Sequence, residues 1–313
     1  MRIARTILGA PCEFDASPGL EARQAPAAPP RLAPAPARED GTAHEVGAPE
    51  AGFAAFLDGV QDSRVVAWLP SGIPVVMATI GAVILERVDR RLVAWGRGAT
   101  VRRTFVLPRA LCDRSVWDAL AAQAPITDSG GEAPHPDSLL ASAVECVESL
   151  RGVDERALAE RWAAEETRPL WADGSVTGLG SAGRSEAVVG VVKSHRTLYA
   201  DASALPALFA LPVGWRTPVL TLAPADRAPA WTWYVRLRAA SLVDPLHGLV
   251  RVECAPRDGP ASAVADTISR WVLVERTPIA LPDARWDVMA YGVARCEAYL
   301  KRGLALRASP NRP

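Results

Sequence analysis

The sequence lacks several features by which common protein classes are recognised. It has five cysteines, an odd number without a CxxC pair, which disfavours a disulfide framework or a zinc site and is typical of a reducing cytoplasm. Its longest apolar run, residues 73–85, is too short to span a bilayer. The first ten residues carry too few apolar side chains for a signal peptide. We therefore expect a cytoplasmic protein without a membrane partner.

Catalytic motifs of several enzyme classes are also missing from the sequence. It contains no HxxxH or HExxH pair, no GxxxxGK followed by Ser or Thr, and no GxSxG. These absences disfavour a zinc hydrolase, a P-loop ATPase and an α/β-hydrolase. Net charge is absent as well, because 35 Lys and Arg balance 35 Asp and Glu. Any nucleic-acid contact must therefore come from a local basic groove or from a partner.

The composition nevertheless supports a folded domain. Apolar residues make up 49% of the chain and charged residues 22%, enough for a sizeable core. The first fifty residues contain eight prolines, and residues 25–37 are almost purely Ala, Pro and Arg. Such a segment buries little apolar area, so residues 1–50 are predicted to be disordered and residues 51–308 to form the domain.

Apolar patterning predicts alternating strands and helices in the domain. A strand over 53–57 is expected to end at Asp58, and a turn at 70–72 to join strands 63–68 and 73–85 into a hairpin. Three-to-four spacing predicts a helix over 139–166, with a break or bend at Gly152. Further elements are predicted as strands 92–95, 101–107, 170–172, 188–193, 231–237 and 248–254, a loop at 127–136, and helices 266–275 and 286–302. This order indicates an α/β or α+β class.

Two apolar segments run into Asp-Gly, at Asp58-Gly59 and at Asp173-Gly174. Each pair can simply make a turn. Alternatively, both carboxylates face one cleft, where their repulsion is relieved by a divalent cation, as in two-metal nucleases. A third ligand would come from the acids of the intervening helix, which are Glu145, Glu148, Asp154, Glu155, Glu160, Glu165 and Glu166.

The order of these segments resembles the NurA nuclease family. The resemblance covers residues 51–305 and lies in five short motifs, at 56–63, 151–159, 170–176, 188–194 and the strand pair 234–237 and 251–253. The family ends in a Tyr-Pro-x-x-Leu-x-x-Ala-His motif. Here Pro278, Leu281 and Ala284 match at that spacing, whereas Thr277 and Arg285 replace the Tyr and the metal-binding His. Arginine stays protonated and cannot ligate a metal, but it can contact a phosphate. Asp283 or Asp287 is an alternative replacement for the histidine.

The resemblance implies an RNase H-like or Piwi-like fold, a mixed sheet flanked by helices. It implies that Asp58, Glu155 and Asp173 hold one or two Mn²⁺ or Mg²⁺ ions, whose bound water attacks a DNA phosphodiester. Lys193 would contact a phosphate, or else lie in solvent, and Glu160 replaces Glu155 if the helix alignment slips by one turn. The family works as a dimer in DNA end processing with HerA-type hexameric ATPases. The alternative is a catalytically impaired subunit that has a structural or DNA-guiding role.

Overall fold

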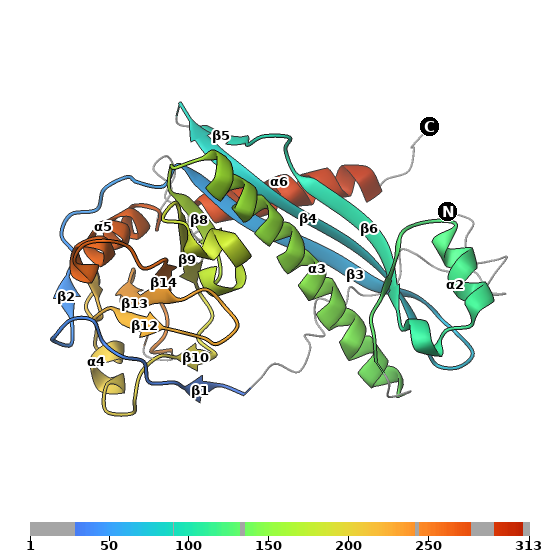
Figure 1. The fold of residues 1–313 in the computed structure, drawn as a ribbon, viewed down its shortest axis with the longest axis horizontal. Helices are drawn as coiled ribbons and strands as arrows, with labels where there is room; N and C mark the ends of the chain where they lie inside the picture. The colour runs from blue at the N-terminus through green and yellow to red at the C-terminus, as the bar shows by residue number, and fades with distance from the viewer. Residues whose placement is uncertain (1–28, 90, 132–134, 242–243, 277–290, 309–313) are drawn as a thin grey trace.

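A computed structural model describes residues 29–89, 91–131, 135–241, 244–276 and 291–308 (Figure 1). Its strands are β1 Arg31–Leu32, β2 His44–Glu45, β3 Ala55–Trp68, β4 Pro74–Val88, β5 Arg91–Ala94, β6 Thr100–Leu107, β7 Ile126–Asp128, β8 Leu170–Asp173, β9 Val188–Val192, β10 Thr197–Leu198, β11 Trp215–Arg216, β12 Leu220–Leu222, β13 Ala230–Arg236 and β14 Leu249–Cys254. Its α-helices are α2 Arg114–Ala121, α3 Pro136–Glu165, α4 Leu205–Phe209, α5 Ala261–Val274 and α6 Tyr291–Ala308. Short 3₁₀ helices cover Arg109–Leu111, Val176–Gly178 and Gly180–Arg184.

One large mixed sheet organises the described residues. Its central order is β6-β4-β3-β8-β9, in which β4 is antiparallel to both neighbours while β3, β8 and β9 are mutually parallel. The predicted mixed sheet flanked by helices is therefore confirmed (Figure 1). Beyond β9 the sheet continues through β14 and β13, which pair with each other as the sequence predicts and run antiparallel.

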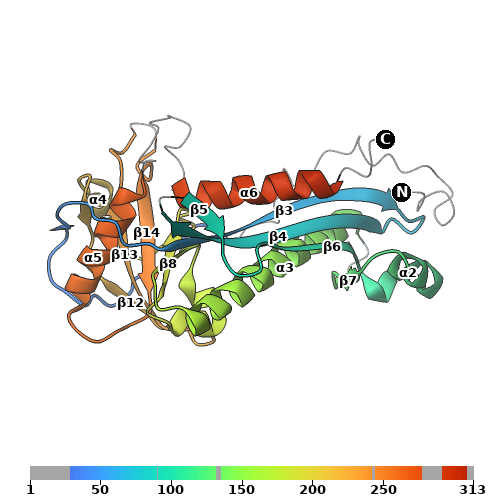
Figure 2. The same ribbon diagram turned by 90° about the horizontal axis from the view of Figure 1, so that it is seen from above.

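The predicted hairpin is the long β3–β4 pair. Its turn closes with hydrogen bonds between Leu69 and both Gly72 and Ile73, and Gly72 adopts a left-handed φ of 78°. Helices α3 and α6 cover opposite faces of this pair (Figure 2). Because side chains alternate along a strand, Phe56 packs toward α6 while Leu57 packs in the core on the other face.

The three predicted helices have different outcomes. Helix α3 runs unbroken through Gly152, so of the predicted break or bend, the break is wrong. It begins at Pro136, where the imidazole of His135 accepts a hydrogen bond from the Asp137 N–H. Helix α5 begins before the predicted 266, and only the part of the 286–302 prediction from Tyr291 onward lies within the described residues, in α6.

None of the helices in the described part of the chain combines the length and apolarity needed to cross a membrane.

The prediction of disorder over 1–50 is wrong for residues 29–50. Strand β1 pairs with β10, and β2 pairs with β11 at the edge of the large sheet. Between them, Glu39 forms an ion pair with Arg216 and accepts a hydrogen bond from the Val219 N–H. The reason is therefore a long-range ion pair with backbone pairing, which local composition does not reveal. Residues 1–28 lie outside the described part of the chain.

Candidate active site

Asp58 lies inside β3 rather than at its end. The strand continues through Gly59 to Trp68 in regular register with β4, so the predicted strand end at Asp58 is wrong. Alternation places Asp58 on the same face as Phe56 and Val60, the face that packs toward α6. Its side chain is buried, and its Oδ1 accepts a hydrogen bond of 2.8 Å from the Gly59 N–H.

Asp173 ends the neighbouring strand, as predicted. It shares a face of β8 with Trp171, whose ring packs in the same core cluster as Phe56 and Val60. Lys193 directly follows β9, and its Nζ lies 2.9 Å from Asp173 Oδ2. Asp58 of β3, Asp173 of β8 and Lys193, directly after β9, are therefore brought together on one face of the sheet.

Burial and neighbouring negative charge raise the pKa values of two acids at this site. Burial, followed by the negative charge of Asp173, raises the pKa of Asp58 to about 8, against a smaller lowering by Lys193. Burial also raises the pKa of Glu155 to about 7, with the charge of Arg151 lowering it and that of Asp173 raising it. The charge of Asp173 thus lies near enough to raise the pKa of both Asp58 and Glu155.

The Glu155 carboxylate approaches Asp58 and Asp173 from the opposite face of β3. A Cβ placed on Gly59 would lie only 2.2 Å from Glu155 Oε1, so this carboxylate packs directly on the glycine. Since Gly59 and Asp58 are consecutive, they face opposite sides of the strand. Glycine is required at position 59 for close packing of the helix carboxylate, which explains an Asp-Gly pair within a strand.

Glu160, the alternative ligand, lies one turn farther along α3 and has other partners. Its Oε1 accepts hydrogen bonds from the Ser181 N–H at 3.0 Å and from the Ser181 hydroxyl at 3.1 Å. Its charge is not among those that raise the pKa of Asp58. Of the two helix acids singled out, the structure brings Glu155 and not Glu160 close to Asp58.

Carboxylate oxygens are the donors that Mg²⁺ and Mn²⁺ prefer, so the chemistry of this residue set fits a hard divalent cation. The placement of these side chains does not match a shared cation site. Among the residues described, no three His, Cys, Asp or Glu side chains are placed so that they could hold a metal ion together. The division of the carboxylates between two faces of β3, and the Lys193 contact to Asp173, account for this physically.

The family-like segment at the end of the domain lies outside the described residues. It includes Thr277, Pro278, Leu281, Ala284 and Arg285, together with Asp283 and Asp287 as replacement ligands. The predicted roles of Arg285 and of these two acids therefore stay predictions.

Glu253 of β14 supports the site but was missed by sequence reasoning. Its carboxylate is fully buried and accepts hydrogen bonds from the Ser175 hydroxyl at 2.6 Å and the Val176 N–H at 3.1 Å, which fixes the turn after Asp173. Arg251 neutralises it through an Nε contact of 3.0 Å. The available signal was a carboxylate within an apolar strand, since such groups stay buried only with partners.

Gly190 of β9 is the second supporting residue that the sequence did not reveal. A Cβ there would lie 2.5 Å from the carbonyl oxygen of Gly174 and 2.9 Å from the backbone nitrogen of Val176. Only glycine therefore allows the turn after Asp173 to fold down onto β9.

Comparisons with known proteins include a distant likeness to a solved structure. No protein-family model matches the chain, and no curated protein matches it. Among solved structures, the NurA nuclease from Sulfolobus solfataricus is similar, with a TM-score of 0.46 and 13% sequence identity over 87% of this chain and 90% of that chain. A likeness this distant carries no argument about chemistry. A function for the chain has to come from its own residues.

Proposed function

We propose that this chain is a divalent-metal-dependent nuclease that cleaves DNA. The observation that supports the proposal most directly is the pair of carboxylates Asp58 and Asp173 on one face of the sheet, with the Lys193 ammonium 2.9 Å from Asp173. Burial and the charge of Asp173 raise the pKa of Asp58, and a divalent cation beside this carboxylate would favour its ionised form.

The proposed ligands are Asp58 and Asp173, which share one face of the sheet. Glu155, the third ligand expected from the sequence, approaches from the other face of β3, and among the described residues these three side chains are not placed to share one ion. A bound Mg²⁺ or Mn²⁺ would supply Lewis-acid and water-activating chemistry. Gly59 and Gly190 set the approach of Glu155 and of the Asp173 turn, while Glu253 holds that turn. Lys193 carries a positive charge beside the acids, where it would attract and orient a phosphate of the substrate.

A nuclease assay with single- and double-stranded linear DNA tests the proposal. Wild type is compared with Asp58→Asn and Asp173→Asn in Mn²⁺, Mg²⁺ or EDTA. We expect metal-dependent cleavage that falls by about a hundredfold or more in both variants. Asp62→Asn, which changes a half-exposed carboxylate on the same strand, is the matched control and should keep the wild-type rate. Folded wild type that cleaves under none of these conditions would overturn the proposal.

A second candidate function is a catalytically impaired subunit with a structural or DNA-guiding role. The ion pair between Lys193 and Asp173 favours it, because a lysine can neutralise that acid in place of a metal. This candidate predicts DNA binding by wild type that is unchanged by EDTA and by Asp58→Asn, without cleavage. The homodimer, the HerA-type ATPase partner, the role in DNA end processing and the cytoplasmic location stay predictions from the sequence.

A further inference from the structure

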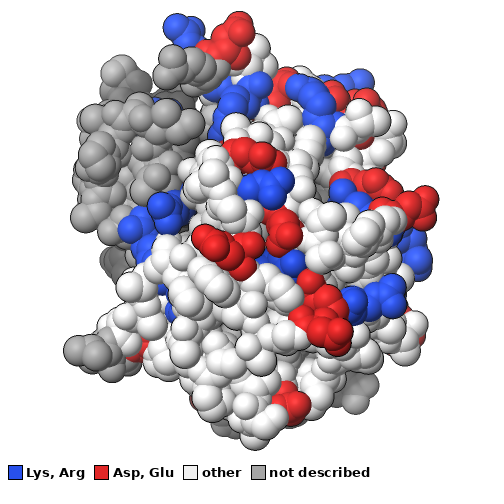
Figure 3. All heavy atoms as spheres, turned by 90° about the vertical axis from the view of Figure 1, so that its left-hand side faces the viewer, with Lys and Arg blue, Asp and Glu red and all other residues white. Residues whose placement is uncertain are grey.

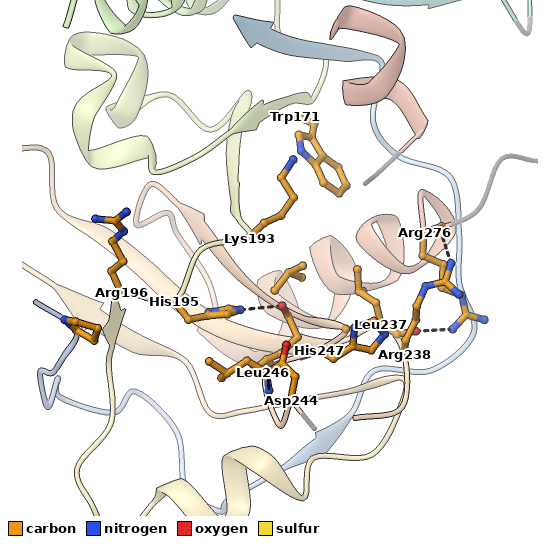
Figure 4. A pocket seen from close by; sticks show the side chains of 14 residues that line it. Trp171, Lys193, His195, Arg196, Leu237, Arg238, Asp244, Leu246, His247 and Arg276 are labelled. Carbon is orange, nitrogen blue, oxygen red and sulfur yellow. Dashed lines mark hydrogen bonds between the residues drawn. The ribbon is translucent and has the colours of Figure 1, made fainter. Parts of the chain in front are cut away.

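A pocket of about 460 Å³ adjoins the carboxylate site on the same face of the sheet (Figure 4). Lys193 and Trp171 line one end of it. Because Lys193 also contacts Asp173, this end of the pocket lies next to the carboxylate site. Its volume lies in the range of about 300–1,000 Å³ that is typical of small-molecule sites. Pocket and carboxylates therefore form one continuous surface joined by Lys193.

The pocket is basic although the chain as a whole is neutral. Lys193, Arg196, Arg238 and Arg276 line it, and among the described lining residues Asp244 is the one carboxylate. By contrast, acidic and basic side chains are interspersed over the described atoms of the face in Figure 3. A local excess of arginine of this kind matches the chemistry of phosphate, which guanidinium groups bind with charge-assisted hydrogen bonds.

Two buried nitrogens, on side chains that line this pocket, have no hydrogen-bond partner among the described residues. One is Nε1 of Trp171, a side chain that is only 2% exposed. The other is Nδ1 of His195, whose Nε2 lies 2.9 Å from the Leu249 carbonyl oxygen and therefore donates to it. Burial lowers the pKa of His195 and favours the neutral ring, so Nδ1 is an acceptor while the indole nitrogen is a donor. Buried polar atoms without partners are rare and are costly unless a ligand satisfies them.

The remaining wall is apolar, with Leu237, Leu246 and Val250 among the lining residues. Cations, one donor, one acceptor and an apolar wall together match the parts of a nucleotide: phosphate, a hydroxyl or amino group, and the flat faces of sugar and base. We propose that this pocket binds one nucleotide unit of a single strand, with its phosphate among the basic side chains and a hydroxyl or amino donor at His195. This assignment rests on the proposed function, because the strand it positions is the one to be cleaved.

Calorimetric binding of deoxycytidine monophosphate to the full chain in EDTA tests the proposal without requiring cleavage. The comparison probes are deoxycytidine and inorganic phosphate, each of which carries only part of the matched chemistry. We expect the nucleotide to bind at least about tenfold more tightly than either. A short single-stranded oligonucleotide should compete with it, and bound nucleotide that it fails to displace would overturn the assignment to a strand.

Variants locate the binding. Arg238→Ala should weaken nucleotide binding by about tenfold, and His195→Phe should weaken it while leaving the weak binding of phosphate unchanged. His195 also bonds to Leu249, so its replacement can disturb the fold. Arg196 is exposed and has no ion-pair partner among the described residues, so Arg196→Ala is the variant least prone to misfold. It too should weaken nucleotide binding. Arg114→Ala on α2 removes an exposed arginine far from the pocket and should change nothing (Figure 1).

Equal binding by wild type and all three pocket variants would overturn the proposal. Its failure is distinguishable from failure of the nuclease proposal. Cleavage by a protein that does not bind the nucleotide in EDTA would contradict the pocket proposal and support the nuclease proposal. Nucleotide binding without cleavage in any metal would support the pocket proposal and contradict the nuclease proposal. Asp58→Asn, which should abolish cleavage, is expected to bind the nucleotide as wild type does.

Discussion

At Asp58, burial and a neighbouring carboxylate act in the same direction, which ties stability to pH. The pKa of this group rises from 3.8 to about 8 on folding. Between those values the unfolded chain has lost the proton while the folded protein keeps it. The free energy of unfolding therefore falls as pH rises through this window and levels off above about pH 8.

Asp58→Asn should remove much of that dependence in the presence of EDTA. We expect the variant to be more stable than wild type near pH 8, by an amount on the order of a few kcal/mol, because no buried carboxylate has to ionise. A shallower slope should remain below about pH 7, since burial also raises the pKa of Glu155. Urea unfolding at a series of pH values measures this. Asp62→Asn controls for loss of one charge on the same strand, and a slope in Asp58→Asn as steep as in wild type would contradict the expectation.

Among the secondary-structure elements, α3 carries a glycine that its own packing does not require. Gly152 lies inside the helix, and a Cβ there would meet nothing within 4 Å. Gly152→Ala should therefore stabilise the protein by about 0.5–1 kcal/mol, through lower backbone entropy of the unfolded chain. Thermal or urea unfolding checks this result.

Gly98→Ala is the matched comparison, because it also adds a methyl group in open space but at a left-handed φ of 84°. It should destabilise by about 1 kcal/mol, since a Cβ disfavours that conformation. If both substitutions changed stability in the same direction, helix propensity would not explain the effect at Gly152.

The elements differ in how far the sequence could predict them. Apolar runs and three-to-four spacing located the hairpin, α3 and the strands β8, β9, β13 and β14, because burial of one face shapes local sequence. The end of β3 was misplaced since Gly59 has the local signature of a turn, whereas its purpose is to admit Glu155 from α3. Which side of β3 that acid approaches depends on packing between elements. For the same reason Glu253 and Gly190 had no local signal that connected them to Asp173.

At the scale of the whole molecule, a buried ion-pair network helps to hold the segment before the domain against it. Arg216, only 1% exposed, contacts Glu39 from this segment and lies 2.6 Å from Asp266 Oδ1 of α5. The composition of this segment predicted disorder because its local apolar content is low. Composition contains no information about Arg216, the ion-pair partner that lies far along the chain. Glu39 shows that a polar segment can be held by its charges and backbone.

Glu39→Ala should destabilise the protein by about 3 kcal/mol, because it leaves Arg216 buried with Asp266 as its remaining acid. Urea unfolding at neutral pH gives the value. Glu50→Ala in the same segment removes a partner of Arg270 in a half-exposed ion pair, and its cost should stay below about 1 kcal/mol. Equal costs for the two variants would show that burial of Arg216 does not set the strength of this contact.

The placement of Asp58 and Gly59 on opposite faces also limits which insertions and deletions the gene for this protein can tolerate. Loss of one codon between 55 and 58 would put the residues before and after the gap out of phase, so that either the start of β3 or Asp58 and Gly59 would face the wrong side of the sheet. The same loss in the 69–72 turn would leave that alternation intact. Length variation between homologous sequences should therefore gather at the turn and be absent just before Asp58.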